Sequence, residues 1–193
     1  LWAEKYMNQH MNNLMDKEEE DYVIAIDTDS LYVNMSSLVS KMSPKNPINF
    51  LDKISEEYFQ PMLDRAYESL ALYTGAKVNR MEMGREVIAD RGIWVAKKRY
   101  ILNVHDNEGV RYKKPKLKLM GIEAVKSSTP QIVREKMKEM FHILVKGTES
   151  ETQKFIGEFR RDFNKLPAED VSFPRGVSDL SKWRDAKDIY GKG

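Results

Sequence analysis

Two aspartates, Asp27 and Asp29, lie in a short polar segment between two apolar runs, Val23–Ile26 and Leu31–Val33. Apolar, β-prone runs on either side of a tight polar corner predict a buried β-hairpin. In extended backbone, side chains two positions apart leave the same face, so the two carboxylates would repel each other unless a cation lay between them. Carboxylate oxygens are preferred ligands of Mg²⁺. The segment therefore suggests a metal site at a strand end.

A simpler interpretation of Asp27-Thr28-Asp29-Ser30 remains open at this point. Asp and Ser side chains often accept hydrogen bonds from the backbone of the turn in which they lie. These four residues alone do not distinguish a turn from a metal site, so other parts of the chain must decide.

Composition excludes several classes of protein. With 193 residues, 41% hydrophobic and 32% charged, the chain has the composition of a folded globular protein and not of a disordered one. No apolar run approaches membrane-spanning length. Cysteine is absent, which excludes disulfides, thiolate catalysis and thiolate zinc sites. The three histidines are far apart and give little support to a histidine metal site or a Ser-His-Asp triad; they are His10, His105 and His142.

Charge is unevenly distributed along the chain. The net charge is only +2, and an acidic run, Glu18–Asp21, precedes the predicted hairpin. The segment from Lys97 to Lys118 holds eight basic and two acidic residues, a net charge of about +6. Such a segment favours binding to a polyanion. A lysine-rich edge strand that resists aggregation is the alternative.

Hydrophobic periodicity and turn residues predict an α+β fold. Thr129-Pro130 has the pattern of a helix start with proline at the first helical position, and Thr148–Glu151 has that of a capping box. The expected elements are a helix over 1–17, the hairpin, a helix over 48–73 that Pro61 kinks or breaks, strands from 78 to 125 with a hairpin turn at 106–109, helices ending near Gly147 and Pro167, and an irregular segment over the last 25 residues.

Three further groups of residues could support chemistry. Met83–Glu86, at the end of a predicted strand, could add a third carboxylate from Glu86, although an exposed strand residue is the simpler interpretation. If Ala96–Tyr100 is a strand, a lysine and a tyrosine share one face and could contact a minor groove, although an amphipathic strand explains the same pattern. Gly121–Pro130 combines a cation, hydroxyls and a helix start, which suits phosphate, and an ordinary capped helix explains the hydroxyls equally well.

In this order and spacing the groups resemble the family B DNA polymerases, and most closely the replicative polymerases of large tailed bacteriophages. The resemblance rests on Asp27-Thr28-Asp29-Ser30, Arg85-Glu86, Lys97-Lys98-Arg99-Tyr100 and Gly121–Pro130, and it extends over nearly the whole chain. One departure is visible, because Ile26 stands where the family usually has glycine before the first aspartate.

The resemblance implies roles for particular residues. Asp29 is expected to be a direct ligand of catalytic Mg²⁺, Asp27 to have a supporting or transient role, and Glu86 to be the acidic palm residue near the metals. Lys98 and Tyr100 resemble the element that holds the primer-template duplex, with Lys98 at the minor groove of the newest base pair. Further DNA contacts are expected from Lys97, Arg99, Lys126, Ser127 and Ser128.

The resemblance also shows what this sequence lacks. The family's first motif, which supplies another obligatory metal ligand, has no counterpart here, and neither do the fingers helix and the exonuclease domain. Residues 27–32 imitate the first motif superficially, but Val33 replaces its proline. Two-metal phosphoryl transfer needs both ions, so we expect the chain alone to bind the metals weakly and to be inactive.

The resulting expectation is a fragment or split subunit of a DNA-directed DNA polymerase. Residues 1–126 would be the C-terminal part of the palm, an antiparallel sheet with the catalytic hairpin at 22–34, and residues 127–193 the start of a thumb that is helical and then irregular. Expected partners are primer-template DNA, a deoxynucleoside triphosphate and an N-terminal polymerase segment carrying the exonuclease, first motif and fingers, all in the cytoplasm of a bacterial host.

Two alternatives come from other classes of function. A nucleotide-sugar transferase also uses Asp-x-Asp at a strand end, but it does not explain the Lys98 and Tyr100 pair or the basic segment. A non-catalytic nucleic-acid-binding module explains the basic segment and predicts binding that does not need Asp29.

Overall fold

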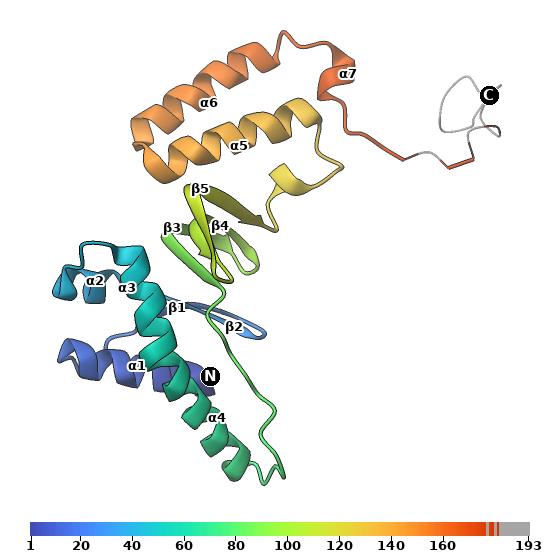
Figure 1. Ribbon diagram of the computed structural model, residues 1–193. Coiled ribbons are helices and arrows are strands. Elements are labelled where there is room, and N and C mark those ends of the chain that lie inside the picture. Colours follow the sequence, from blue (N-terminus) through green and yellow to red (C-terminus); the bar gives the residue numbers. More distant parts are fainter. Residues whose placement is uncertain (177, 180, 182–193) are drawn as a thin grey trace. The chain divides into compact units, whose positions relative to one another are not determined.

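The computed structural model describes residues 1–176, 178, 179 and 181. The chain forms two compact units. Figure 1 shows the elements coloured along the sequence. Unit 1 consists of residues 1–98 and 102–118, and unit 2 consists of residues 99–101 and the chain from residue 119 on. Each unit is described separately below.

Helices and strands follow one another in the order of an α+β fold, which confirms the predicted class. A two-stranded hairpin and a three-stranded antiparallel sheet of order β3-β4-β5 are flanked by helices. The elements are α1 (Trp2–Met15), β1 (Val23–Asp27), β2 (Ser30–Val33), α2 (Ser36–Met42), α3 (Pro47–Ile54), the π-helical turn η1 (Ser55–Phe59), α4 (Gln60–Tyr73), β3 (Val87–Ala96), β4 (Arg99–Asn107), β5 (Val110–Met120), the 3-10 turn η2 (Glu123–Val125), α5 (Gln131–Lys146), α6 (Glu149–Phe163) and α7 (Ala168–Val171).

The main buried cluster of unit 1 lies between α1 and α4, which cross each other in Figure 1. Met7 and Met11 of α1 have helical spacing and are buried, as the periodicity predicts. They join Phe59, Met62, Leu63 and Tyr67 from the other side, together with Ala3, Tyr22, Val23 and Leu38. The first residues of the hairpin are therefore held in the core.

The long helix predicted over 48–73 is interrupted where proline requires it. Pro61 has no N–H to donate, and its ring would clash with the carbonyl of Glu57 in a regular α-helix. The structure places the π-helical turn η1 directly before Pro61, between α3 and α4. The predicted kink is therefore present as a π-helical turn between two α-helices.

Other predictions are only partly correct. Residues 78–86 precede β3 as irregular chain, so a strand at Met81–Met83 is wrong, and α2 was not predicted. Pro130 is the N-cap of α5 and not its first helical residue. The capping box of Thr148 and Glu151 is confirmed by both of its hydrogen bonds.

The segment that was predicted to be irregular, the last 25 residues, is only partly described. It contains most of the short helix α7, and residues 177, 180 and 182–193 lie outside the described residues. Within the described residues, the structure has no helix that is both long and apolar enough to cross a bilayer.

A network of two arginines and two aspartates joins α3 to the sheet in unit 1. Asp106, whose side chain is only 1% exposed, accepts hydrogen bonds from Arg85, from Arg111 at 2.9 Å and from the backbone of Gly109 at 3.0 Å. Both arginines also pair with Asp52 of α3. The negative charge of the buried carboxylate is thus balanced by two guanidinium groups and a backbone N–H, as a charge in the interior requires.

The network predicts an acid-sensitive contribution to stability. Burial alone would raise the pKa of Asp106, but hydrogen bonds from Arg111 and Arg85 outweigh it and hold the pKa below its ordinary value of 3.8. A pKa lowered by folding adds stability above the ordinary value, and this stability is lost as the pH falls through the lowered one. We expect the urea midpoints of the wild type and Asp106→Asn to differ at about pH 6, and this difference to shrink as the pH falls below 3.8. A difference that stays the same as the pH falls would contradict this account.

Candidate metal and nucleic-acid site

The hairpin is anchored to α1 by two asparagines. Oδ1 of Asn8 accepts hydrogen bonds from the backbone N–H groups of Tyr22 and Val23, at 2.9 and 3.2 Å. Asn12, which is buried, donates to the carbonyl of Glu20 and accepts from its N–H. These bonds satisfy backbone groups that enter β1, and they fix where the hairpin begins.

The hairpin differs from the prediction in two respects. Asp27 is the last residue of β1 and pairs with Ser30, so Asp29 lies in the turn and not on the same strand face as Asp27. The expectation of a hairpin buried throughout is also wrong, since Ile24 and Ile26 are 50% and 40% exposed. One face of β1 packs on the core, and the other carries uncovered apolar side chains.

Asp27 is held by the turn and by a lysine far along the chain. Its Oδ1 accepts hydrogen bonds from the backbone N–H of Thr28 at 2.9 Å and from the Thr28 hydroxyl at 3.3 Å, and it lies 3.2 Å from Nζ of Lys98. The Thr28 N–H lowers the pKa of Asp27 most, and Lys98 lowers it further. The carboxylate is therefore charged at neutral pH. The turn bonding that was the simpler interpretation exists, together with a cation from another element.

Lys98 reaches Asp27 from a strained backbone position. Lys97 and Lys98 form the two-residue turn between β3 and β4, so Ala96–Tyr100 is not a continuous strand, and the condition for a shared strand face of Lys98 and Tyr100 does not hold. Lys98 has φ 60°, which is unfavourable for a residue with a Cβ. Tyr100 is in β4 and only 6% exposed. Strain at a residue whose side chain is a predicted ligand contact is typical of functional sites.

Replacing Lys98 by glycine should separate stability from binding. Glycine adopts positive φ without steric cost, so Lys98→Gly should raise the free energy of unfolding by about 1 kcal/mol. The lost ion pair is exposed and offsets little of this gain. The same change removes the ammonium group and should weaken binding to duplex DNA. Urea denaturation and fluorescence anisotropy measure the two effects.

Glu108→Gly is a matched control, because Glu108 also has positive φ, at 52°, in the turn between β4 and β5. It should give a similar gain in stability without weaker DNA binding. If Lys98→Gly and the wild type bound duplex DNA with equal affinity, Lys98 would not be a DNA contact.

An aromatic contact within unit 1 joins the hairpin to β3. The rings of Tyr32 in β2 and Trp94 in β3 meet edge to face with centroids 5.4 Å apart. Gly92 makes room for the indole, since a Cβ at Gly92 would lie 2.6 Å from two of its carbons. A glycine inside a strand often marks such a close approach. The contact holds β3 beside the hairpin, close to the turn that carries Lys98.

Gly92→Ala should displace Trp94 and loosen this contact. We expect a loss of about 1–3 kcal/mol of unfolding free energy, the usual cost of overpacking, and a change in tryptophan fluorescence. Gly157→Ala in α6 is the control, because nothing lies within 4 Å of its Cβ position and alanine favours a helix. Gly92→Ala with wild-type stability and emission would show that the ring has room to move.

Two carboxylates at the hairpin turn are of the type that the predicted magnesium site needs. Asp27 and Asp29 supply carboxylate oxygens, which suit a hard divalent cation, and Asp29 is exposed with no hydrogen bond or ion pair of its side chain in the described chain. Glu86 pairs with Lys118. Among the described residues, no three His, Cys, Asp or Glu side chains are grouped to hold a metal ion. Two aspartates fit as a partial ligand set, and the role of Glu86 stays a prediction.

The remaining predicted DNA contacts fall in unit 2 or on the turn. Arg99 and Lys126 both pair with Glu123, at 3.8 and 3.0 Å, and the hydrogen bond from Lys126 lowers the pKa of Glu123 most. Ser127 and Ser128, which follow directly, are exposed, as is Lys97 on the turn. Sequence reasoning named these cations but missed the carboxylate that holds two of them together.

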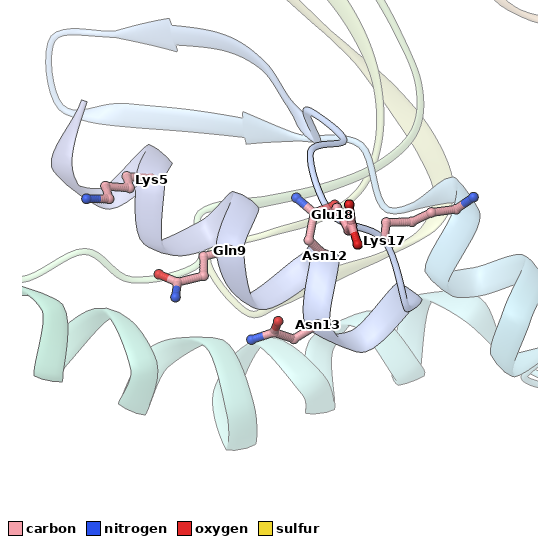
Figure 2. Close-up of a pocket in the computed structure, with 6 residues that line it drawn as sticks. All are labelled: Lys5, Gln9, Asn12, Asn13, Lys17 and Glu18. Carbon is pink, nitrogen blue, oxygen red and sulfur yellow. The ribbon is translucent and has the colours of Figure 1, made fainter.

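A hollow beside α1, outside the hairpin turn, has a polar lining (Figure 2). Lys5, Gln9 and Asn13 project from α1, and Lys17 and Glu18 follow the helix. Asn12 also lines it, but its amide is already bonded to the backbone of the segment before β1. The lining mixes both charges and brings no set of groups together for catalysis.

Comparison with known proteins identifies relatives over almost the entire chain. The chain is 30% identical over 198 aligned residues to the DNA-directed DNA polymerase of Enterobacteria phage T4, and 34% identical over 196 to that of Escherichia phage RB69. The alignments cover 95% and 94% of the chain but 22% of each relative. No family model matches. The resemblance to phage DNA polymerases is confirmed, and the chain spans about a fifth of the length of these relatives.

Proposed function

Because the chain is a homologue of one segment of the phage DNA-directed DNA polymerases, we propose that it forms the C-terminal part of a family B palm and the base of a thumb. In the complete enzyme, the primer 3′-hydroxyl attacks the α-phosphate of a deoxynucleoside triphosphate, a new P–O bond forms, and pyrophosphate leaves. The proposed place of action is the cytoplasm of the infected bacterium.

The observation that supports this role best is the contact between Asp27 and Lys98. The two residues come from separate motifs, 71 positions apart (98 − 27), and their side chains lie 3.2 Å from each other. A polymerase needs a carboxylate for metal and a cation for the primer terminus at one place. Asp27 orients the ammonium of Lys98, which can then donate to acceptors on the minor-groove edge of the newest base pair.

The aspartates have different proposed roles. Asp29, exposed at the turn, is the direct ligand of Mg²⁺, and Asp27, already bonded to Thr28 and Lys98, supports it. When bound, the metal neutralises charge on the triphosphate and lowers the pKa of the primer hydroxyl. Tyr100, Arg99, Lys97, Lys126, Ser127 and Ser128 are proposed to hold the primer-template, and Glu86 is proposed to lie near the metals.

The chain is proposed to work with a polypeptide that carries the exonuclease, first motif and fingers. Ile24 and Ile26 leave one face of the hairpin uncovered, and the relatives are more than four times longer than the matched segment. A further palm strand that packs on this face and supplies another aspartate would complete the two-metal site.

Primer extension with and without such a complementary polypeptide tests the proposal. We expect extension, dependent on Mg²⁺, only when both polypeptides are present. Efficient extension by the chain alone would show that its metal site is already complete, and failure of the mixture despite complex formation would contradict the proposed role.

The non-catalytic nucleic-acid-binding module is the second candidate, favoured by the absence of a three-ligand group among the described residues. It predicts salt-sensitive duplex binding and no extension under any condition. A nucleotide-sugar transferase predicts Mn²⁺-dependent binding of nucleotide sugars, and the polymerase relatives give it no support.

A further inference from the structure

We propose that Lys113, Lys114 and Lys116 on strand β5 form a second contact with the phosphate backbone of duplex DNA, separate from the site at Asp27 and Lys98. The three residues are called the β5 lysine track below. This inference rests on the proposed function, since it extends the DNA surface of the same protein.

The first argument is the unbalanced charge of the strand. Between Val110 and Met120 the sequence holds five basic residues and no acidic one. Two of the five are neutralised within the protein, because Arg111 pairs with Asp106 and Asp52, and Lys118 pairs with Glu86. In the described chain, the β5 lysine track has no ion pair with any carboxylate.

The second argument is accessibility. The sheet order β3-β4-β5 places β5 at an edge, and all three lysines of the track are exposed. Lys116 extends over the ring of Tyr112, with Nζ 4.3 Å from the ring centroid, so part of its side chain is held in place. An accessible, partly ordered cation loses less entropy on binding than a free one.

The third argument is reach. A strand rises about 3.3 Å per residue, so the track extends over about 10 Å. Because successive strand residues leave opposite faces, Lys114 and Lys116 lie on one face of β5 and Lys113 lies on the other. At a sheet edge, long lysine side chains from both faces can approach one phosphate backbone, a contact that positions the duplex without reading its sequence.

The test is the salt dependence of binding of the 193-residue chain to a fluorescein-labelled DNA duplex, followed by anisotropy. Each phosphate contact adds about 0.9 to the slope of log affinity against log salt. The triple variant Lys113→Gln, Lys114→Gln, Lys116→Gln should lose up to about 2.7 of that slope. The matched control Lys5→Gln, Lys17→Gln, Lys45→Gln removes the same charge from other exposed positions of unit 1 and should lose much less.

The outcomes separate this inference from the proposed function. If the track variant and the control give the same slope while Lys98→Gly weakens binding, the track is not a DNA contact and the proposed function stands. If the wild-type chain shows no salt-dependent duplex binding, both proposals fail. If the slope of log affinity against log salt falls in the track variant and not in the control variant, the second contact is supported.

Discussion

Asp106→Ala should cost about 3–5 kcal/mol of unfolding free energy, the range found when one partner of a buried ion pair is removed. The carboxylate of Asp106 is 1% exposed and bonded to Arg85, Arg111 and the Gly109 backbone. Without it, the guanidinium groups of Arg85 and Arg111 keep only Asp52 as a charged partner in the network. Since domains are stable by only about 5–15 kcal/mol, this loss should be visible as a large fall in the urea midpoint.

Asp162→Ala is the control for this prediction, because Asp162 pairs with Lys165 and both side chains are more than 70% exposed. An exposed pair contributes about 0–1 kcal/mol, so the control should unfold almost as the wild type does. Arg85→Met combined with Asp106→Ala should cost less than the sum of the two single changes, since they share one network. Additive costs, or equal midpoints of Asp106→Ala and Asp162→Ala, would contradict the network's role.

In the proposed two-polypeptide polymerase, Asp29→Asn should abolish most of the activity, while Asp27→Asn should reduce it less. Losing a direct ligand of a catalytic metal removes several kcal/mol of transition-state stabilisation, which corresponds to about 10³-fold or more in rate. Residues that support a ligand typically contribute 10–100-fold. Single-turnover primer extension at saturating DNA, with the complementary polypeptide present, measures both rates.

Duplex affinity provides the control for the aspartate variants. Asp29 is exposed and forms no described ion pair, so Asp29→Asn should bind duplex DNA and unfold in urea as the wild type does. Asp27→Asn changes a group 3.2 Å from Nζ of Lys98 and should alter duplex affinity as well as rate. Equal losses of activity in both variants would contradict the assignment of a direct and a supporting role.

Local patterns predicted the parts of the fold that depend on local chemistry. The capping box at Thr148, the turn at Glu108-Gly109 and the apolar stripe of α1 follow from hydrogen bonds or periodicity over a few residues, and the structure contains all three. The kink near Pro61 was predicted for the same reason, although its form as a π-helical turn was not. The family resemblance, carried by the order of several motifs, was confirmed by the phage relatives.

The parts that the sequence did not predict depend on contacts between distant residues. Nothing near Asp106 indicates that Arg85 will neutralise it, and the partner of Glu123 in unit 2, Arg99, is 24 positions away (123 − 99). The positive φ of Lys98 contradicts the strand propensity of its neighbours, since the sheet must turn there. Gly92 was the one local signal that a side chain, here the indole of Trp94, lies close to the backbone, because an isolated glycine in a strand often marks a close approach.

The position of the buried cluster along the chain has a consequence for biosynthesis. All of its buried members lie between Ala3 and Tyr67, whereas Lys98 follows Tyr67 by 31 residues (98 − 67). At about 5–20 residues per second, a ribosome needs roughly 2–6 seconds to add that segment. Contacts of short sequence separation form quickly, so the packed helices and the hairpin can assemble within that interval. Asp27 can therefore lie in a folded scaffold before Lys98 is synthesised, and the contact between Asp27 and Lys98 forms after that scaffold.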